Sequence, residues 1–137
     1  MPIETRIDDT LGIRIHTLTG PVEPEQIAAE LTGTVSDPDF DPKMPALWDI
    51  RAATGSLTGS QVRDLAQLVG GLWREQRPPR VALLVASGLH YGLARMYEQY
   101  IDLTRKMDMK VFKVDEEALT WLTSSQSPPV PPAPLPE

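Results

Sequence analysis

One stretch of the sequence constrains the fold more than any other: residues 81–100, which read VALLVASGLHYGLARMYEQY. Its first six residues, 81–86, carry neither a charge nor a polar side chain, which is typical of a strand that is covered on both faces. Ser87 and Gly88 follow as a short turn, and a helical pattern begins after them. The stretch therefore predicts one βα unit of an α/β fold and places the turn after the strand at the surface.

The other elements follow from hydrophobic periodicity and from residues that begin or end helices. Two alternating runs, 3–7 and 11–18, flank a polar turn and predict an antiparallel hairpin at a sheet edge. In the second run, Arg14 and His16 alternate with Ile13 and Ile15. We expect buried strands at 46–50, at 81–86 as the central strand and at 110–114, and helices from about 23 to 35, from 58 to before Pro78, from 89 to 107 and from 115 to 122.

This order, ββαβαβαβα, predicts a sheet of four or five strands, mostly parallel with an antiparallel edge, because strand–helix–strand crossovers give parallel neighbours. A chain of 137 residues is long enough for one domain with its own core. We expect that domain to span residues 1–123. Residues 124–137 contain six prolines and are expected to form a disordered, extended tail.

Composition excludes several classes of function. The formal net charge of −6 repels phosphate backbones, so we expect no binding of nucleic acid. The chain has no cysteine, which excludes disulfides, thiolate catalysis and cysteine-ligated zinc. It begins without an apolar signal segment, and no run approaches the roughly 18 apolar residues of a membrane span. We therefore expect a cytoplasmic protein with no membrane span.

A first group of candidate binding residues follows the strand at 46–50. Asp49 and Arg51 lie on or just beyond that strand, and Ser56 and Ser60 belong to the loop at 51–60. Ligands of open α/β sheets bind outside the carboxyl ends of the strands, so these residues are candidates for a binding crevice. The alternative is structural: Asp49 caps a neighbouring loop or helix, and Arg51 is its solvent-exposed partner.

A second group of candidates lies at the turn after the strand at 81–86. Ser87, His90, Tyr91 and Arg95 crowd this turn and the start of the next helix. Backbone N–H groups at a helix start attract anions, and the imidazole and phenol would orient a polar group there. The alternative is that Ser87 caps the helix, Tyr91 packs on a loop, and Arg95 pairs with Glu98 or Gln99.

Catalytic and metal sites have little support in the sequence. His16 and His90 are the only histidines, and neither has a metal-ligating companion at helical or turn spacing, so we expect no metal and no cofactor. Ser87 and His90 are close in sequence, but they lie outside a GxSxG elbow. An enzyme using Asp49, His90 or Tyr91 therefore ranks last among the alternatives.

Long apolar side chains at helical spacing leave two interpretations open. They line an apolar ligand pocket, or they are simply core, which is the more frequent role of methionine and aromatic residues at such positions. The residues in question are Trp73, Met96, Tyr97, Tyr100 and Met107.

Several motifs together resemble a known family. LWDI in the third strand, RVALLVAS in the fourth, YGLARMYE in the helix after it and KVFKVDEEALTWL near the end look like the STAS-like superfamily, and more narrowly like its bacterial SpoIIAA-like family. The resemblance covers about residues 3–123. It implies a non-enzymatic module that binds a protein partner or a small ligand, and a related fold carries apolar lipids.

In the anti-sigma-factor antagonists of this superfamily, a serine in an Asp-Ser motif after the third strand is phosphorylated. The matching positions here read Ala52, Ala53 and Thr54, so the motif is missing. The resemblance still predicts a regulatory module that binds a protein partner, with a homodimer left open. The alternative is a module that binds a lipid-like or anionic small molecule.

Overall fold

The computed structural model describes residues 3–41, 44–54, 57–72, 80–86, 88–104 and 108–124, and within these ranges it leaves out the side chains of residues 70, 72, 88–90 and 102–104. The elements follow the expected order. They are β1 (Ile3–Asp8), β2 (Ile13–Pro21), α1 (Pro24–Ser36), β3 (Ala46–Thr54), α2 (Gly59–Leu72), β4 (Arg80–Leu84), α3 (Gly88–Thr104), β5 (Asp108–Phe112) and α4 (Asp115–Thr123).

The five strands form one sheet in the order β1-β2-β3-β4-β5. β1 is an antiparallel edge strand that pairs with β2, and each of the other neighbouring pairs is parallel. The expected α/β class, element order and antiparallel edge are thus confirmed. β3, rather than β4, occupies the middle of the sheet, which corrects the expectation that residues 81–86 form the central strand.

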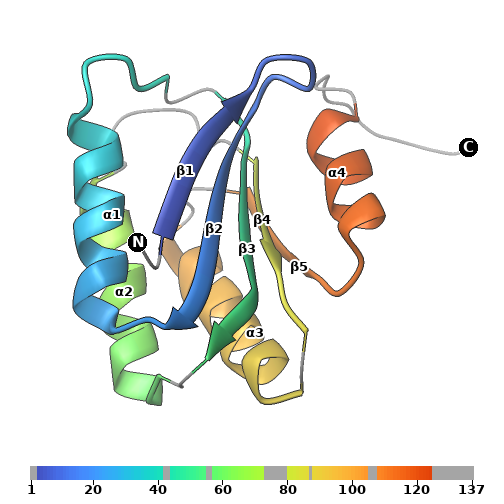
Figure 1. Ribbon diagram of the computed structural model, residues 1–137. Helices are drawn as coiled ribbons and strands as arrows, with labels where there is room; N and C mark the ends of the chain where they lie inside the picture. Colours follow the sequence, from blue (N-terminus) through green and yellow to red (C-terminus); the bar gives the residue numbers. More distant parts are fainter. Residues whose placement is uncertain are drawn as a thin grey trace, which may run out of the picture.

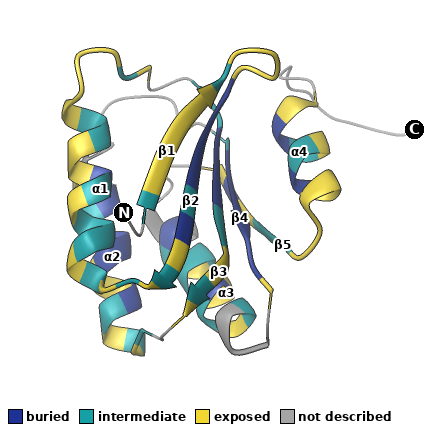
Figure 2. Ribbon diagram, in the orientation of Figure 1, coloured by how far each residue is buried: buried dark blue, intermediate teal, exposed yellow. Residues whose placement is uncertain are grey.

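Helices cover the two faces of the sheet unequally. α1, α2 and α3 lie on one face, and α4 alone lies on the other (Figure 1). Alternate residues of the same strands supply two separate cores: Trp48 and Leu83 face the three helices, whereas Leu47 and Leu84 face α4. β1 is largely exposed, while β2 and β4 are mostly buried (Figure 2).

The hairpin and the helix starts show the local chemistry that the sequence indicates. Gly12 closes the β1–β2 turn with φ of 70°, a left-handed conformation that glycine adopts without strain. Thr58 and Gln61 form a capping box before α2: Thr58 Oγ1 accepts from the Gln61 N–H at 3.1 Å, and Gln61 Oε1 accepts from the Thr58 N–H at 2.9 Å. Val114 is the N-cap of α4, and Asp115 lies inside its first turn.

The third strand is longer than its apolar run suggests. The loop was expected to begin at Arg51, but β3 continues to Thr54, so Arg51 lies within the strand. The extension occurs because Ala52, Ala53 and Thr54 pair with Thr19, Gly20 and Pro21 of β2 after an irregularity in register. This pairing gives the C-terminal end of β3 its backbone hydrogen bonds. A pattern of alternating side chains cannot indicate how far such pairing between strands extends.

In the part of the chain that the structure describes, no helix combines the length and the apolar character needed to cross a membrane. Residues 125–137, which hold the prolines of the predicted tail, lie outside the described residues.

Candidate functional site

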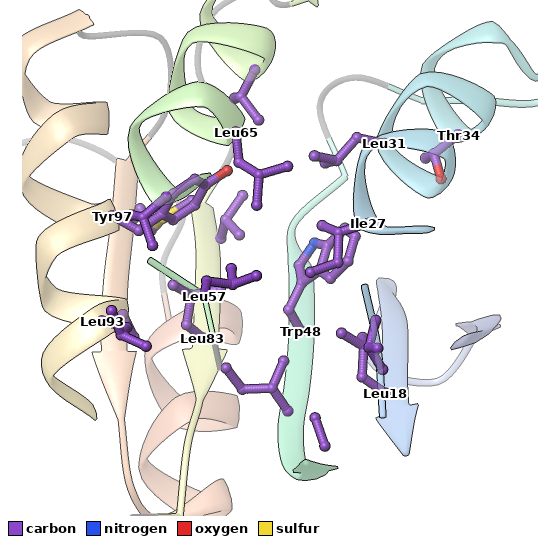
Figure 3. A pocket seen from close by; sticks show the side chains of 18 of the residues that line it. Leu18, Ile27, Leu31, Thr34, Trp48, Leu57, Leu65, Leu83, Leu93 and Tyr97 are labelled. Carbon is purple, nitrogen blue, oxygen red and sulfur yellow. The ribbon is translucent and has the colours of Figure 1, made fainter. Parts of the chain in front are cut away.

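An apolar cavity lies between the sheet and the three helices on its larger face (Figure 3). Its volume is about 150 Å³, and β2, β3, β4, β5 and all three helices contribute to its wall. We call it the central cavity. Nearly all of its lining side chains are apolar, and they include Leu18, Leu31, Trp48, Leu65, Leu83 and Val69.

The cavity exists because α1 covers its part of the sheet incompletely. The expected stripe of Ile27, Ala28, Leu31 and Val35 does face the core, but only Leu31 is fully buried. Ile27 and Leu31 point from α1 toward Trp48 of β3 (Figure 3). Ile27 is only partly buried, as are Ala28 and Val35, so α1 leaves this side of the sheet incompletely covered.

Two polar residues of β2 are buried at the wall of this cavity. Arg14 is 6% exposed and lines the cavity directly, and His16 is completely buried. The imidazole of His16 stacks on the indole of Trp48 with ring centroids 4.0 Å apart and an interplanar angle of 20°. Trp48 itself lines the cavity, so one stack joins the polar cluster to the apolar wall.

Hydrogen bonds connect these residues to α1 and β1. Arg14 Nε donates to His16 Nε2 at 2.9 Å, so His16 uses Nε2 as an acceptor. The other ring nitrogen, Nδ1, lies 3.1 Å from Glu30 Oε2 and 2.9 Å from Thr5 Oγ1. The Thr5 hydroxyl also donates to Glu30 Oε2. Since Arg14 cannot accept a hydrogen bond, the ring carries its proton on Nδ1 and is neutral.

Burial dominates the electrostatics of this cluster. Burial and the nearby Arg14 guanidinium lower the pKa of His16 to about 4, although Glu30 opposes the shift. Burial also lowers the pKa of Arg14, and this effect exceeds the opposite influence of Glu30 and Asp41. Arg14 therefore remains a cation in an environment that solvates it poorly.

Two residues of the first predicted group, Asp49 and Arg51, lie on the other face of the sheet. Asp49 and Arg51 form a bidentate pair, with Arg51 Nε 3.0 Å from Asp49 Oδ1 and Arg51 NH2 2.9 Å from Asp49 Oδ2. Arg51 NH1 also lies 3.9 Å from Asp115 Oδ2, at the start of α4. Burial would raise the pKa of Asp49, but the hydrogen bonds from Arg51 lower it below its usual value. This arrangement matches the structural alternative, in which Arg51 is the partner of Asp49.

The second group is only partly described. Arg95 NH1 pairs with Glu98 Oε1 at 2.7 Å, as the structural alternative predicted. Tyr91 packs against the core of the three-helix face, and Lys113 Nζ lies 4.4 Å from the centroid of its ring. Ser60 is exposed at the start of α2. Ser56, Ser87 and the side chain of His90 lie outside the described residues.

The structure therefore separates Asp49 and Arg51 from Tyr91. Asp49 and Arg51 belong to the α4 face, whereas Tyr91 packs on the opposite face. A reaction that used both Asp49 and Tyr91 would need one pocket open to both faces of the sheet. Of the three residues considered for an enzyme, Asp49 and Tyr91 therefore do not share a site, and the side chain of His90 lies outside the described residues.

Of the long apolar side chains that left two interpretations open, Tyr97 lines the central cavity. Its ring extends from α3 toward the cavity (Figure 3), and burial raises the pKa of its phenol, so the hydroxyl stays protonated. Tyr100 packs against the core, and Met96 is 36% exposed. Trp73 and Met107 lie outside the described residues.

Arg14 is the functional candidate that sequence reasoning missed. Arg14 and His16 alternate with Ile13 and Ile15, and this alternation alone does not say that the polar pair is buried as well. The available signal was α1, which follows the strand directly and needs a surface for its apolar stripe. Within the described ranges, no cluster of three or more histidine, cysteine or acidic side chains is arranged to hold a metal ion.

Comparisons with known proteins identify the fold alone. No protein-family model matches the chain, and no curated protein matches it in sequence. The structure is similar to the crystal structure of an uncharacterised protein from Shewanella loihica PV-4, described as a DUF3478 family member with a SpoIIAA-like fold. The match has a TM-score of 0.56 and 21% sequence identity, and covers 88% of this chain and 91% of the other. The expected SpoIIAA-like fold is thereby confirmed.

Proposed function

We propose that this protein is a non-catalytic binding module that holds an apolar small molecule in the central cavity. The cavity carries the proposal: about 150 Å³ of space, enclosed almost entirely by apolar side chains of the sheet and three helices. Ligand sites in proteins are typically apolar hollows with a few placed polar groups, and Arg14 and Tyr97 are such groups here.

The volume sets the size of the ligand. An engineered apolar cavity of about 150 Å³ stays free of water and binds benzene. The central cavity is also partly open, so a longer molecule has room to extend beyond its walls. We infer a ligand whose enclosed part is about as large as one benzene ring.

A titration with toluene, followed by methyl NMR, tests this proposal. We expect the methyl resonances of Leu31, Val62 and Val69 to shift in a saturable way, because these residues line the cavity. Leu84 of β4 and Leu122 of α4 belong to the core on the opposite face and serve as internal controls whose resonances stay in place. Toluene that moves no cavity resonance up to its solubility limit would rule out the proposal.

A pair of neighbouring substitutions locates the site. Ala53 is half-buried and lines the cavity, whereas Ala52 is exposed and points away from it. The ring of Ala53→Phe should occupy the space of the ligand and abolish the toluene shifts. Ala52→Phe adds the same ring one residue earlier in β3 and should leave toluene binding unchanged.

A regulatory module that binds a protein partner is the second candidate. The start of α3 favours it, because Tyr91 lies beside Lys113 and Arg95 is about half exposed there. These groups form a polar, aromatic surface of the kind that protein interfaces use. Its test is the double substitution Tyr91→Ala and Arg95→Ala, described in the Discussion.

A further inference from the structure

The ligand of the central cavity has to be compatible with one buried cation. Arg14 lies in β2 at the cavity wall and is only 6% exposed. Leu18 lines the same cavity four residues further along the strand, about 13 Å away. The cavity therefore has a cationic region near Arg14 and an apolar region that extends toward Leu18.

The protein itself uses only part of the Arg14 guanidinium. Among the described residues, Arg14 donates one side-chain hydrogen bond, through Nε to His16 Nε2. No carboxylate of the described residues comes within 4.0 Å of its nitrogens. Glu30 has the opposite charge, but its carboxylate is bound by His16 and Thr5. On one side, the guanidinium lies over the Phe40 ring, 5.1 Å from its centroid.

His16 holds the guanidinium in place without neutralising it. The imidazole is neutral, since it accepts from Arg14 through Nε2 and has its proton on Nδ1, beside Glu30. Its stacking on Trp48 fixes the plane of the ring. Arg14 therefore keeps a full positive charge and a set orientation, and a buried charge gains strongly from an opposite charge that it can reach.

We infer that the ligand is an apolar monocarboxylate whose carboxylate binds the Arg14 guanidinium and whose hydrocarbon part fills the central cavity. The inference rests on the proposed function and names its ligand class. A carboxylate matches the planar fork of the guanidinium with two parallel hydrogen bonds. A phosphate monoester would carry more charge into an apolar space, where each further charge is costly to desolvate.

Three probes that share one alkyl chain separate the head group from the chain: octanoate, octanol and octylammonium. Binding is measured by titration calorimetry at a salt concentration of about 0.15 M, which screens the overall charge of −6. We expect octanoate to bind at least about tenfold more tightly than octanol, because a charge-assisted hydrogen bond adds at least that much. Octylammonium should show no binding.

Arg14→Met tests the anchor directly, since methionine retains an apolar side chain of similar length without the charge. We expect this variant to lose the preference for octanoate and to bind octanol at least as well as the unchanged protein. Arg63→Met is the matched control, because Arg63 is exposed on α2 and its removal changes the net charge equally. That variant should keep the preference for octanoate.

The outcomes distinguish the inference from the proposed function. If octanol and octanoate bind equally well, or if Arg14→Met keeps the preference, the carboxylate assignment is wrong while the apolar cavity remains a ligand site. If none of the three probes nor toluene binds, the proposed function fails as well. Should Arg14→Met fail to fold, the head-group series on the unchanged protein still decides the question.

Discussion

The two faces of the sheet use alternate residues of the same strands, yet they pack in different ways. On the α4 face, Ile13, Ile15, Leu47, Leu84 and Leu122 form a small core that is almost completely buried. On the opposite face, three helices cover a larger area and leave a cavity of about 150 Å³ beside a buried polar cluster. The single helix α4 covers a core that is almost completely buried, whereas the three helices on the opposite face leave a cavity between them and the sheet.

The difference shows where this fold has room for function. α4 is one short helix with a narrow apolar stripe, so it packs on the strands without competing with another helix for the same surface. The larger face must match three helices to one twisted surface, and α1 also covers the buried polar residues Arg14 and His16 of β2. Unfilled space therefore remains on the face where several helices have to pack together. We expect substitutions on the two faces to have different effects on stability and binding.

The largest expected effect is the loss of protein stability when a side chain in the core on the α4 face is truncated. Leu122 is 1% exposed and packs in the α4 core, so Leu122→Ala should lower the free energy of unfolding by about 3 kcal/mol. Leu31→Ala removes the same atoms beside an existing cavity and should cost about half as much. Urea denaturation of both variants checks this, and equal losses would mean that the two faces are packed alike.

A second large effect is a loss of stability in acid that arises on the cavity face. The pKa of His16 is about 4 in the folded protein and 6.5 in its unfolded reference, so the unfolded chain binds more protons between these values. Stability should hold above pH 6.5 and fall by up to about 3 kcal/mol as the pH is lowered toward 4.

His16→Gln is the control for this acid effect. Glutamine does not titrate, and it retains an acceptor for Arg14 and a donor for Glu30. Urea midpoints at pH 7, 5.5 and 4 should therefore fall less in this variant than in the unchanged protein. Because Arg14, Glu30 and Asp41 are present in both proteins, parallel curves would assign the acid loss to another group.

Filling the cavity should raise the free energy of unfolding, whereas the truncations at Leu122 and Leu31 should lower it. Ala53→Phe places a ring in the central cavity and should raise the free energy of unfolding by about 1 kcal/mol. Ala52→Phe exposes the same ring and should change it by less than about 0.5 kcal/mol. Thermal melts of the two variants compare the faces of a single strand, and a destabilised Ala53→Phe would show that this wall has no room.

The surface at the start of α3 should affect binding more than folding. Replacing Tyr91 and Arg95 with alanine removes a partly exposed ion pair, a cation–π contact and the packing of the Tyr91 ring on the core, so the free energy of unfolding should fall by roughly 1–2 kcal/mol. If the protein acts through a partner, capture of that partner should weaken while the circular dichroism spectrum is unchanged. Undiminished capture by the double variant would exclude this surface as the interface.

The smallest expected effect concerns the ion pair on the α4 face. Asp49→Asn removes one charge of the Asp49–Arg51 pair, which is only partly buried. The free energy of unfolding should fall by about 0.5 kcal/mol, and less at 1 M salt, because exposed pairs are weak and screened. Its binding of octanoate should equal that of the unchanged protein. A large loss of octanoate binding would show that the Asp49–Arg51 pair on the α4 face is energetically coupled to the central cavity.

Much of the fold was predictable because it rests on local signals. The apolar run at 81–86 marked β4, the alternating runs marked the β1–β2 hairpin, and Thr58 with Gln61 marked the start of α2. The strand ends were less predictable. β3 extends to Thr54 because β2 offers it partners, and pairing between distant segments leaves no local trace.

The candidate site was harder to predict than the fold. Asp49, on or just beyond one predicted strand, and Tyr91, in the turn after another, were both candidates for binding, but the period of two along a strand sends Asp49 to the α4 face. Arg14 and His16 were predicted only to lie in an edge hairpin. They are buried because α1, which follows β2 in the chain, packs back over that side of β2. This tertiary contact is seen only in the folded structure.

By itself, the sequence determined the order of the elements, the α/β class and the alternating pattern of the hairpin strands, because these depend on neighbours within a few residues. Only the tertiary structure decided which face each polar residue meets and how well each face is filled. Those outcomes depend on how separate helices fit one twisted surface, and here they leave one buried cation, Arg14, beside one apolar cavity.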